Sequence, residues 1–234
     1  MTPTKVLQKT ALTPEIILLK LEPESSFNYQ AGDYLTLGFE PGDEEAVKDF
    51  HRFKPFSIAN APKDNTPIEL HIRLNQNTDA DQVWIDKIKA LQLGDKVWIN
   101  GPFQQFRLEK NLEHPIILVA GGTGFAPMKS LLEQLLEQNF TQPIDLYWGA
   151  KTESELYLKD WISNLAAQTP NLSYHPILSE QKHPDYRQGW VHQAVLQDFP
   201  DLSDKIVYVC GPWPMQQAAK ADFLQANLKE THFN

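Results

Sequence analysis

The spacing of hydrophobic positions changes part-way along the chain. Up to about Leu108, short segments in which apolar and polar residues alternate are separated by turn residues such as Gly32-Asp33, Pro41-Gly42 and Gly94-Asp95. This pattern is typical of strands in an antiparallel barrel or sandwich. The expected strands are Val6–Leu12, Glu15–Leu21, Tyr34–Phe39, Pro55–Ala59, Ile68–Leu74 and Lys96–Asn100. One helix, at Asp79–Leu91, interrupts them, and its expected inner face consists of Val83, Ile85, Ile88 and Leu91.

After Leu108 strands and helices alternate. The expected strands are Ile116–Ala120, Ile144–Trp148, Ser173–Leu178 and Ile206–Cys210, and the expected helices are Pro127–Gln138, Ser154–Gln168, Trp190–Leu196 and Pro214–Leu228. Such alternation predicts a parallel sheet covered by helices, with ligands bound at the carboxyl ends of its strands. We therefore expect two domains, an antiparallel β-barrel or sandwich at 1–110 and an α/β domain at 111–234. The polar stretch Glu109-Lys110-Asn111 marks the boundary.

Composition narrows the classes of function. Hydrophobic residues make up 41% of the chain and aromatic residues 11%, which is enough for packed cores. The net charge of −9 argues against nucleic acid as a partner, because nucleic-acid binding depends on cationic contacts to phosphate. The apolar runs are too short to span a membrane, and Met1 to Thr10 lack the apolar core of a signal peptide, so a cytoplasmic protein is expected.

Cysteine and histidine limit the cofactors further. A single cysteine, Cys210, excludes an intrachain disulfide and a cysteine-ligated iron–sulfur cluster. The seven histidines show no spacing typical of metal ligands, so no metal site is expected.

The glycine-rich stretch after the strand at Ile116–Ala120 carries the clearest chemistry. Gly121-Gly122-Thr123-Gly124 is not followed by the Gly-Lys-Ser/Thr of a P-loop, and Pro127 replaces the last glycine of the dinucleotide motif G-x-G-x-x-G. A glycine turn between a strand and a helix nevertheless favours a phosphate group lying against backbone amides. Other strands end at Gly149 and at Cys210-Gly211-Pro212. Glycine at these ends is expected to keep side chains out of a common crevice, which indicates a shared nucleotide site. The alternative is a tight turn with no ligand.

Two sets of motifs resemble a known superfamily. Residues 117–127 (ILVAGGTGFAP), Tyr147-Trp148-Gly149-Ala150 and Tyr208-Val209-Cys210-Gly211-Pro212 are similar to the pyridine-nucleotide domain of ferredoxin–NADP reductases. Lys54-Pro55-Phe56-Ser57 resembles the Arg-x-Tyr/Phe-Ser/Thr signature of the flavin-binding barrel that precedes that domain. Size and motif order resemble the compact bacterial NAD(P)H:flavin reductases. The resemblance implies hydride transfer from NADH or NADPH to a flavin (FMN, riboflavin or FAD) that is a substrate or a loosely bound cofactor.

The resemblance also implies roles for residues of the barrel. The Ser57 hydroxyl and amide would serve flavin N5, and Phe56 would pack near the ring; Pro55, His71 and Ile72 are further expected contacts. Lys54 stands where the family has an arginine that binds flavin phosphate, and the two side chains are not equivalent at such a site. Asp79 and Asp81 would repel a pyrophosphate at the start of the helix, which favours a weakly bound, diffusing flavin.

On the nucleotide side, the resemblance places Thr123 near the nicotinamide carboxamide, within the turn formed by Gly121, Gly122 and Gly124. Cys210 would approach the nicotinamide together with Gly211 and Pro212, although a small buried hydrophobic role is the alternative. Lys151 would lie near the adenosine ribose and favour a 2′-phosphate, unless it is an ordinary surface residue. No acid typical of a strict NAD site is clear, although Glu153 and Glu155 are close, so the preference between NADH and NADPH stays open.

Two other functions remain open at this point. The chain could keep its flavin bound and pass electrons to a separate ferredoxin or oxygenase. It could also be a non-catalytic nucleotide-binding regulatory module, for which the Lys54 substitution is the only hint. The acidic run Asp43-Glu44-Glu45 is expected to be a solvated loop, or else a contact for a basic protein partner.

Overall fold

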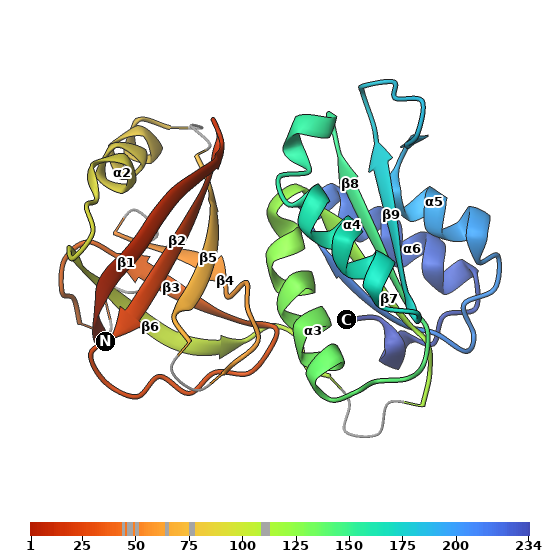
Figure 1. The fold of residues 1–234 in the computed structure, drawn as a ribbon, viewed down its shortest axis with the longest axis horizontal. Coiled ribbons are helices and arrows are strands. Elements are labelled where there is room, and N and C mark those ends of the chain that lie inside the picture. Colours follow the sequence, from red (N-terminus) through yellow and green to blue (C-terminus); the bar gives the residue numbers. More distant parts are fainter. Residues whose placement is uncertain (44, 46–48, 50–51, 64–65, 75–77, 109–112) are drawn as a thin grey trace. The chain divides into compact units, whose positions relative to one another are not determined.

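The computed structural model describes residues 1–43, 45, 49, 52–63, 66–74, 78–108 and 113–234. The chain divides into two compact units, Met1–Arg107 with Lys129–Gln134, and Leu108–Met128 with Leu135–Asn234 (Figure 1). The expected boundary stretch at 109–111 and Glu44 of the acidic run lie outside the described residues.

The first unit is built on a six-stranded antiparallel sheet. Its strands are β1 (Thr2–Thr13), β2 (Ile16–Pro23), β3 (Asp33–Gly38), β4 (Phe53–Ser57), β5 (Ile68–Arg73) and β6 (Lys96–Gln104). They are ordered β4-β3-β6-β1-β2-β5. Ile58, directly after β4, forms a bridge to Leu70 of β5, so the two outer strands meet. The expected antiparallel barrel is confirmed.

Helix α2 (Asp79–Ala90) covers part of the barrel core (Figure 1). Thr78 caps its first turn: its side chain accepts a hydrogen bond from the Asp81 amide, while the Asp81 carboxylate accepts one from the Thr78 amide. The buried face contains Trp84, Ile85 and Ile88. The assignment of Val83 to this face was wrong, because its side chain is 58% exposed.

The second unit is a five-stranded parallel sheet with helices, as expected. Its strands are β7 (Ile116–Gly121), β8 (Ile144–Ala150), β9 (Leu172–Leu178), β10 (Arg187–Gln188) and β11 (Ile206–Cys210), in the order β10-β9-β8-β7-β11. Its α-helices are α3 (Phe125–Glu137), α4 (Lys159–Gln168), α5 (Val191–Asp198) and α6 (Trp213–Gln225) (Figure 1). Buried strands such as β7, in which every residue is buried, explain the continuous apolar runs in the sequence.

Two local features differ from the expected elements. Helix α4 begins at Lys159 rather than Ser154, because Glu153–Glu155 form a separate 3-10 turn and Leu156 leaves the helical region with φ −80° and ψ 62°. Strand β10 was not expected, since two exposed residues carry no hydrophobic pattern. It pairs in parallel with the end of β9.

Candidate functional site

Strand β4 carries the expected flavin motif. The Lys54 ammonium forms an ion pair with Asp81 and lies 5.4 Å from the centre of the Trp84 ring. Phe56 stacks on the same ring at 5.3 Å between centroids, with 29° between the planes. The side chains of Lys54 and Phe56 therefore point to the face of β4 that meets α2, as alternation along a strand requires.

Ser57 lies on the other face of β4. Its hydroxyl is 3.0 Å from Gln105 Oε1 and donates a hydrogen bond to it. The neighbouring Pro55 is exposed. Because Phe56 and Ser57 point to opposite faces, a ring bound at the Ser57 hydroxyl would reach Phe56 through its backbone rather than through its ring.

His71 and Ile72 lie on β5 with buried side chains. Ile72 belongs to the hydrophobic core of the barrel. His71 Nε2 is 3.0 Å from Glu69 Oε1. Neither side chain is exposed to a ligand, so any contact of these residues with flavin would have to come from the backbone.

Glu69 is the centre of a buried network within the first unit. Lys129, from the part of α3 that groups with this unit, lies 3.1 Å from Glu69 Oε1, 2.7 Å from Glu133 Oε1 and 3.1 Å from the Ala59 carbonyl oxygen. Burial alone would raise the pKa of Glu69, but hydrogen bonding to His71 and the charge of Lys129 outweigh it and hold the pKa at about 2. Burial lowers the pKa of His71 below its usual 6.5. Through the hydrogen bond from Lys129 to the Ala59 carbonyl oxygen, the network holds the backbone that follows the flavin motif.

This network predicts loss of stability in acid. Both Glu69 and His71 bind protons more weakly in the folded than in the unfolded state, so the unfolded state gains protons first as the pH falls. Between about pH 6.5 and 5 the His71 contribution should reduce the free energy of unfolding by at most about 1.4 kcal/mol per pH unit. Denaturant unfolding of wild type and His71→Gln measures it, and the variant should have the shallower slope. Equal slopes would contradict the assignment.

In the second unit, the glycine turn packs closely against the end of β11. A Cβ added at Gly124 would lie 2.1 Å from the Cys210 carbonyl oxygen, and one at Gly121 would lie 2.5 Å from Met215 Sδ. Gly122 has a positive φ of 55°, a conformation that glycine adopts without strain. The turn therefore needs glycine at these positions for its own conformation and packing.

The glycines that end the other strands have the same explanation. A Cβ at Gly149 would meet Val191 Cβ at 2.9 Å, and one at Gly211 would meet Met215 Cε at 2.6 Å. The expectation was that these glycines keep side chains out of a ligand crevice. Protein atoms occupy those spaces instead, so close approach between elements is sufficient to require glycine there.

The sheet brings most of the expected nucleotide residues to one edge. Cys210 pairs with Ala120, and Gly121 pairs with Gly149, so the turn and the ends of β8 and β11 are neighbours. Thr123 and Cys210 are partly exposed there, and Pro212 is exposed. Such an edge, at the carboxyl ends of parallel strands, is where α/β sheets bind nucleotides.

Lys151 lies just after β8, and its ammonium is 3.0 Å from the Glu180 carboxylate. Both side chains are exposed, at 64% and 60%, so solvent weakens the pair and Lys151 can exchange partners. Glu153 forms an ion pair with Lys159, and its carboxylate also lies 3.6 Å from His183 Nε2.

Trp148 is a supporting residue that the sequence motif contains but did not single out. Its indole N–H donates a hydrogen bond to the Gly122 carbonyl oxygen at 2.9 Å. Its ring stacks on Phe125, with centroids 3.8 Å apart and planes 7° apart. A buried tryptophan normally finds a partner for its N–H, and here the partner is the turn itself.

Trp148→Phe should weaken binding of the nicotinamide nucleotide roughly threefold to tenfold, since one hydrogen bond contributes about 0.5–1.5 kcal/mol. Titration with NADH measures the effect. Tyr147→Phe is the matched control, because it removes a neighbouring hydrogen bond, the 2.7 Å contact to Asp198, which does not involve the turn. Equal effects of the two variants on NADH affinity would contradict a positioning role for Trp148.

Comparison with known proteins agrees with both units. Residues 118–221 match the family described as the oxidoreductase NAD-binding domain. The chain is 33% identical to an NAD(P)H-flavin reductase of Vibrio harveyi over 225 residues, which cover 94% of this chain and 90% of that protein. The chain belongs to the NAD(P)H-flavin reductase family.

Other proteins similar to this chain are longer. The chain is 38% identical over 220 residues to the CDP-6-deoxy-L-threo-D-glycero-4-hexulose-3-dehydrase reductase of Yersinia pestis, and the match covers 93% of this chain but 62% of that protein. A cytochrome P450 reductase from Amycolatopsis has the same fold, with a TM-score of 0.88 and 24% identity over all of this chain and 68% of that one. In the part of the chain that the structure describes, no helix has the length and apolar character needed to cross a membrane.

Proposed function

We propose that the protein transfers hydride from NADH or NADPH to a flavin that it binds weakly, such as FMN, riboflavin or FAD. The observation that carries this proposal is the match to an NAD(P)H-flavin reductase across 94% of the chain, since it spans the barrel as well as the α/β unit. Bound together, the nicotinamide supplies the hydride and the flavin accepts it at N5.

On the α/β unit, the proposed nucleotide contacts are Gly121, Gly122, Thr123, Gly124, Lys151, Cys210, Gly211 and Pro212. The turn fits a nucleotide because it is held in place by close packing and by the Trp148 hydrogen bond, which leaves little to reorganise on binding. The partly exposed Thr123 hydroxyl can orient a carboxamide. The exposed Lys151 can meet a 2′-phosphate if it exchanges Glu180 for that group, which is an argument for accepting NADPH as well as NADH.

On the barrel, the proposed flavin contacts are Lys54, Pro55, Phe56, Ser57, His71 and Ile72. Ser57 is the proposed catalytic residue, because its hydroxyl is held by Gln105 on the open face of β4 and can hydrogen-bond a ring nitrogen. No acid–base group is needed for hydride transfer itself. The protein contributes orientation and proximity.

Weak flavin binding follows from the state of Lys54 and the start of α2. Lys54 already pairs with Asp81, and the capping box between Thr78 and Asp81 already uses amides of the first turn. A pyrophosphate at this helix end would have to displace a carboxylate that is bound on two sides. These contacts support flavin as a diffusing substrate rather than a permanently held FAD.

The proposal is tested by the dependence of NADH and NADPH oxidation on added flavin. Oxidation should require riboflavin or FMN and should continue after exhaustive metal chelation. Oxidation that proceeds equally without flavin, or that stops on chelation, would refute the proposal.

A second candidate is a reductase that retains its flavin and delivers electrons to a separate ferredoxin or oxygenase. The 38% identity to the Yersinia pestis dehydrase reductase favours it, because that protein is named as the reductase of another enzyme. Protein that purifies with one flavin per chain would favour this second function. No NAD(P)H oxidation with any flavin would instead favour a regulatory nucleotide-binding module.

A further inference from the structure

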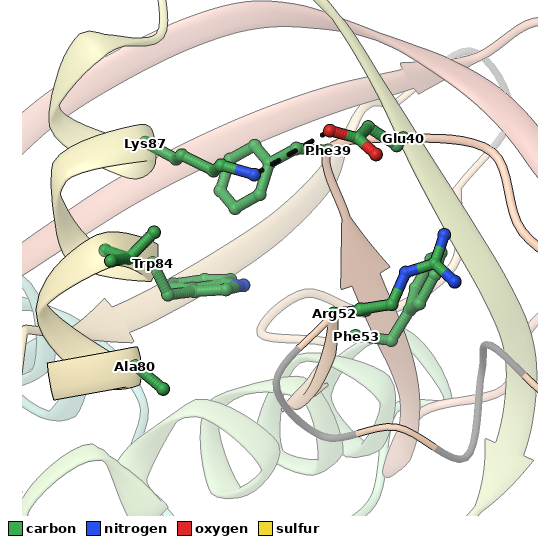
Figure 2. Close-up of a pocket in the computed structure, with 8 residues that line it drawn as sticks. Phe39, Glu40, Arg52, Phe53, Ala80, Trp84 and Lys87 are labelled. Atoms are coloured by element: carbon green, nitrogen blue, oxygen red, sulfur yellow. Dashed lines mark ion pairs between the residues drawn. The ribbon is translucent and has the colours of Figure 1, made fainter. Parts of the chain in front are cut away.

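A small hollow lies on the barrel between α2 and the adjoining ends of β3 and β4 (Figure 2). Its volume is about 80 Å³. About 10–15 Å³ of such space is enough for one water molecule, whereas drug-sized ligands occupy pockets of about 300–1,000 Å³. The hollow therefore suits a compact group of a few heavy atoms and not a heterocyclic ring.

Cationic side chains reach the hollow from two sides. Lys87 comes from α2 and Arg52 from the residue preceding β4, and both line the hollow. In Figure 2 the Lys87 side chain extends toward Glu40, whereas Arg52 lies across the hollow with its guanidinium end turned outward. The Lys87 ammonium is 3.9 Å from Glu40 and 5.5 Å from the Phe39 ring. With exposures of 47% and 71%, Lys87 and Glu40 form a loose, solvent-screened pair. Within the described residues, no carboxylate forms an ion pair with Arg52.

Trp84 contributes a hydrogen-bond donor at the same place. The residue is 4% exposed, and its indole nitrogen is buried with no hydrogen-bond partner among the described residues. Figure 2 shows this nitrogen at the end of the ring that faces Arg52. A buried polar group without a hydrogen-bond partner destabilises the folded protein by roughly 1–3 kcal/mol. A hydrogen-bond acceptor bound beside Arg52 would remove this destabilisation.

We propose that this hollow binds a phosphate group through Arg52, Lys87 and the Trp84 N–H. Phosphate oxygens only accept hydrogen bonds from such groups, and all three side chains donate. A guanidinium can engage two oxygens of a phosphate at once, which a lysine cannot. If this phosphate belongs to flavin mononucleotide, the hollow is the phosphate-binding part of the flavin site, and the proposal then rests on the function proposed above.

The position of the hollow explains how a lysine at position 54 can be tolerated. Trp84 separates the two places: Lys54 and Phe56 pack against its ring, whereas its nitrogen edge faces the hollow. Lys54 is held by Asp81, so its charge is partly offset. Arg52 supplies the planar guanidinium group, able to bind two phosphate oxygens, that Lys54 lacks. The Glu40 carboxylate competes with a bound phosphate for Lys87, because it pairs with Lys87 until a more highly charged anion replaces it.

The test compares dissociation constants for flavin mononucleotide, riboflavin and inorganic phosphate in wild type, Arg52→Gln and Lys87→Gln. Each substitution should weaken flavin mononucleotide about fivefold, the effect of a charge-assisted contact reduced by solvent exposure, and should leave riboflavin within about twofold. Lys89→Gln is the matched control, since Lys89 lies on the same helix but does not line the hollow. Glu40→Gln should strengthen binding of flavin mononucleotide.

The ligands distinguish the sources of phosphate. If inorganic phosphate competes with flavin mononucleotide and both weaken in Arg52→Gln, the flavin's own phosphate occupies the hollow. If only inorganic phosphate weakens, the hollow binds a phosphate group from another molecule, and the assignment of chemistry still stands. If neither ligand responds to Arg52→Gln or Lys87→Gln more than to Lys89→Gln, the proposal is overturned. Riboflavin-dependent NADH oxidation reports separately on the proposed function, because riboflavin has no phosphate.

Discussion

Gly124→Ala is expected to weaken binding of the nicotinamide nucleotide at least tenfold while leaving flavin binding unchanged. The added Cβ would lie 2.1 Å from the Cys210 carbonyl oxygen and 2.8 Å from the Gly211 nitrogen. Both are backbone atoms, so either the turn or the end of β11 must move. Overpacking of this kind typically costs about 1–3 kcal/mol, and about 1.4 kcal/mol corresponds to a tenfold change in affinity.

Separate titrations with NADH and riboflavin measure the effect of Gly124→Ala. Gly94→Ala is a suitable control, because Gly94 has a φ of 90° in the barrel and the nearest atom to an added Cβ is 3.9 Å away. It should lower stability through backbone strain without changing NADH affinity. A folded Gly124→Ala protein with wild-type NADH affinity would show that the turn is not part of the nucleotide site.

Ser57→Ala is expected to reduce turnover at saturating flavin by roughly 10- to 100-fold. A hydrogen bond directed at the reacting centre contributes about 1–3 kcal/mol, which corresponds to about one to two powers of ten in rate. The affinity for NADH should change little, since Ser57 lies on the barrel. Gln105→Leu should have a smaller effect in the same direction, because Gln105 only orients the Ser57 hydroxyl. Unchanged turnover in Ser57→Ala would remove this residue from the mechanism.

The periodicity of the sequence was sufficient to predict the two kinds of sheet. Alternating positions produced the strands of the barrel, and continuous apolar runs such as β7 produced the buried parallel strands. What periodicity could not show was the closure of the barrel, because the bridge from Ile58 to Leu70 joins residues with no local relationship.

The local errors have physical causes. Val83 and Trp84 are adjacent, but Val83 lies five residues before Ile88, which is about 140° away around the helix, so helical spacing does not place the two on one face. The structure buries Trp84, which lies four residues before Ile88 and seven before Leu91 on the same helical face. The larger ring fills the space against Phe56 and Phe39.

At the candidate site, the sequence located residues but not their partners. The glycines were expected to face a ligand, and the structure shows that neighbouring backbone and Met215 occupy the space beside three of them, Gly121, Gly124 and Gly211. The ion pair of Lys54 with Asp81 and the hydrogen bond from Trp148 to Gly122 depend on tertiary contacts. Motifs identify the strands that end at the site, whereas the charge state and rigidity of the site depend on residues outside those motifs.

Anaerobic reduction of riboflavin by NADH, with riboflavin in large molar excess over the protein, tests the central claim most directly. If the flavin is a diffusing substrate, reduced flavin should accumulate to many equivalents per chain, with one nicotinamide consumed for each flavin reduced. Wild-type protein that reduces no more than one flavin per chain, or none at all, would contradict the account.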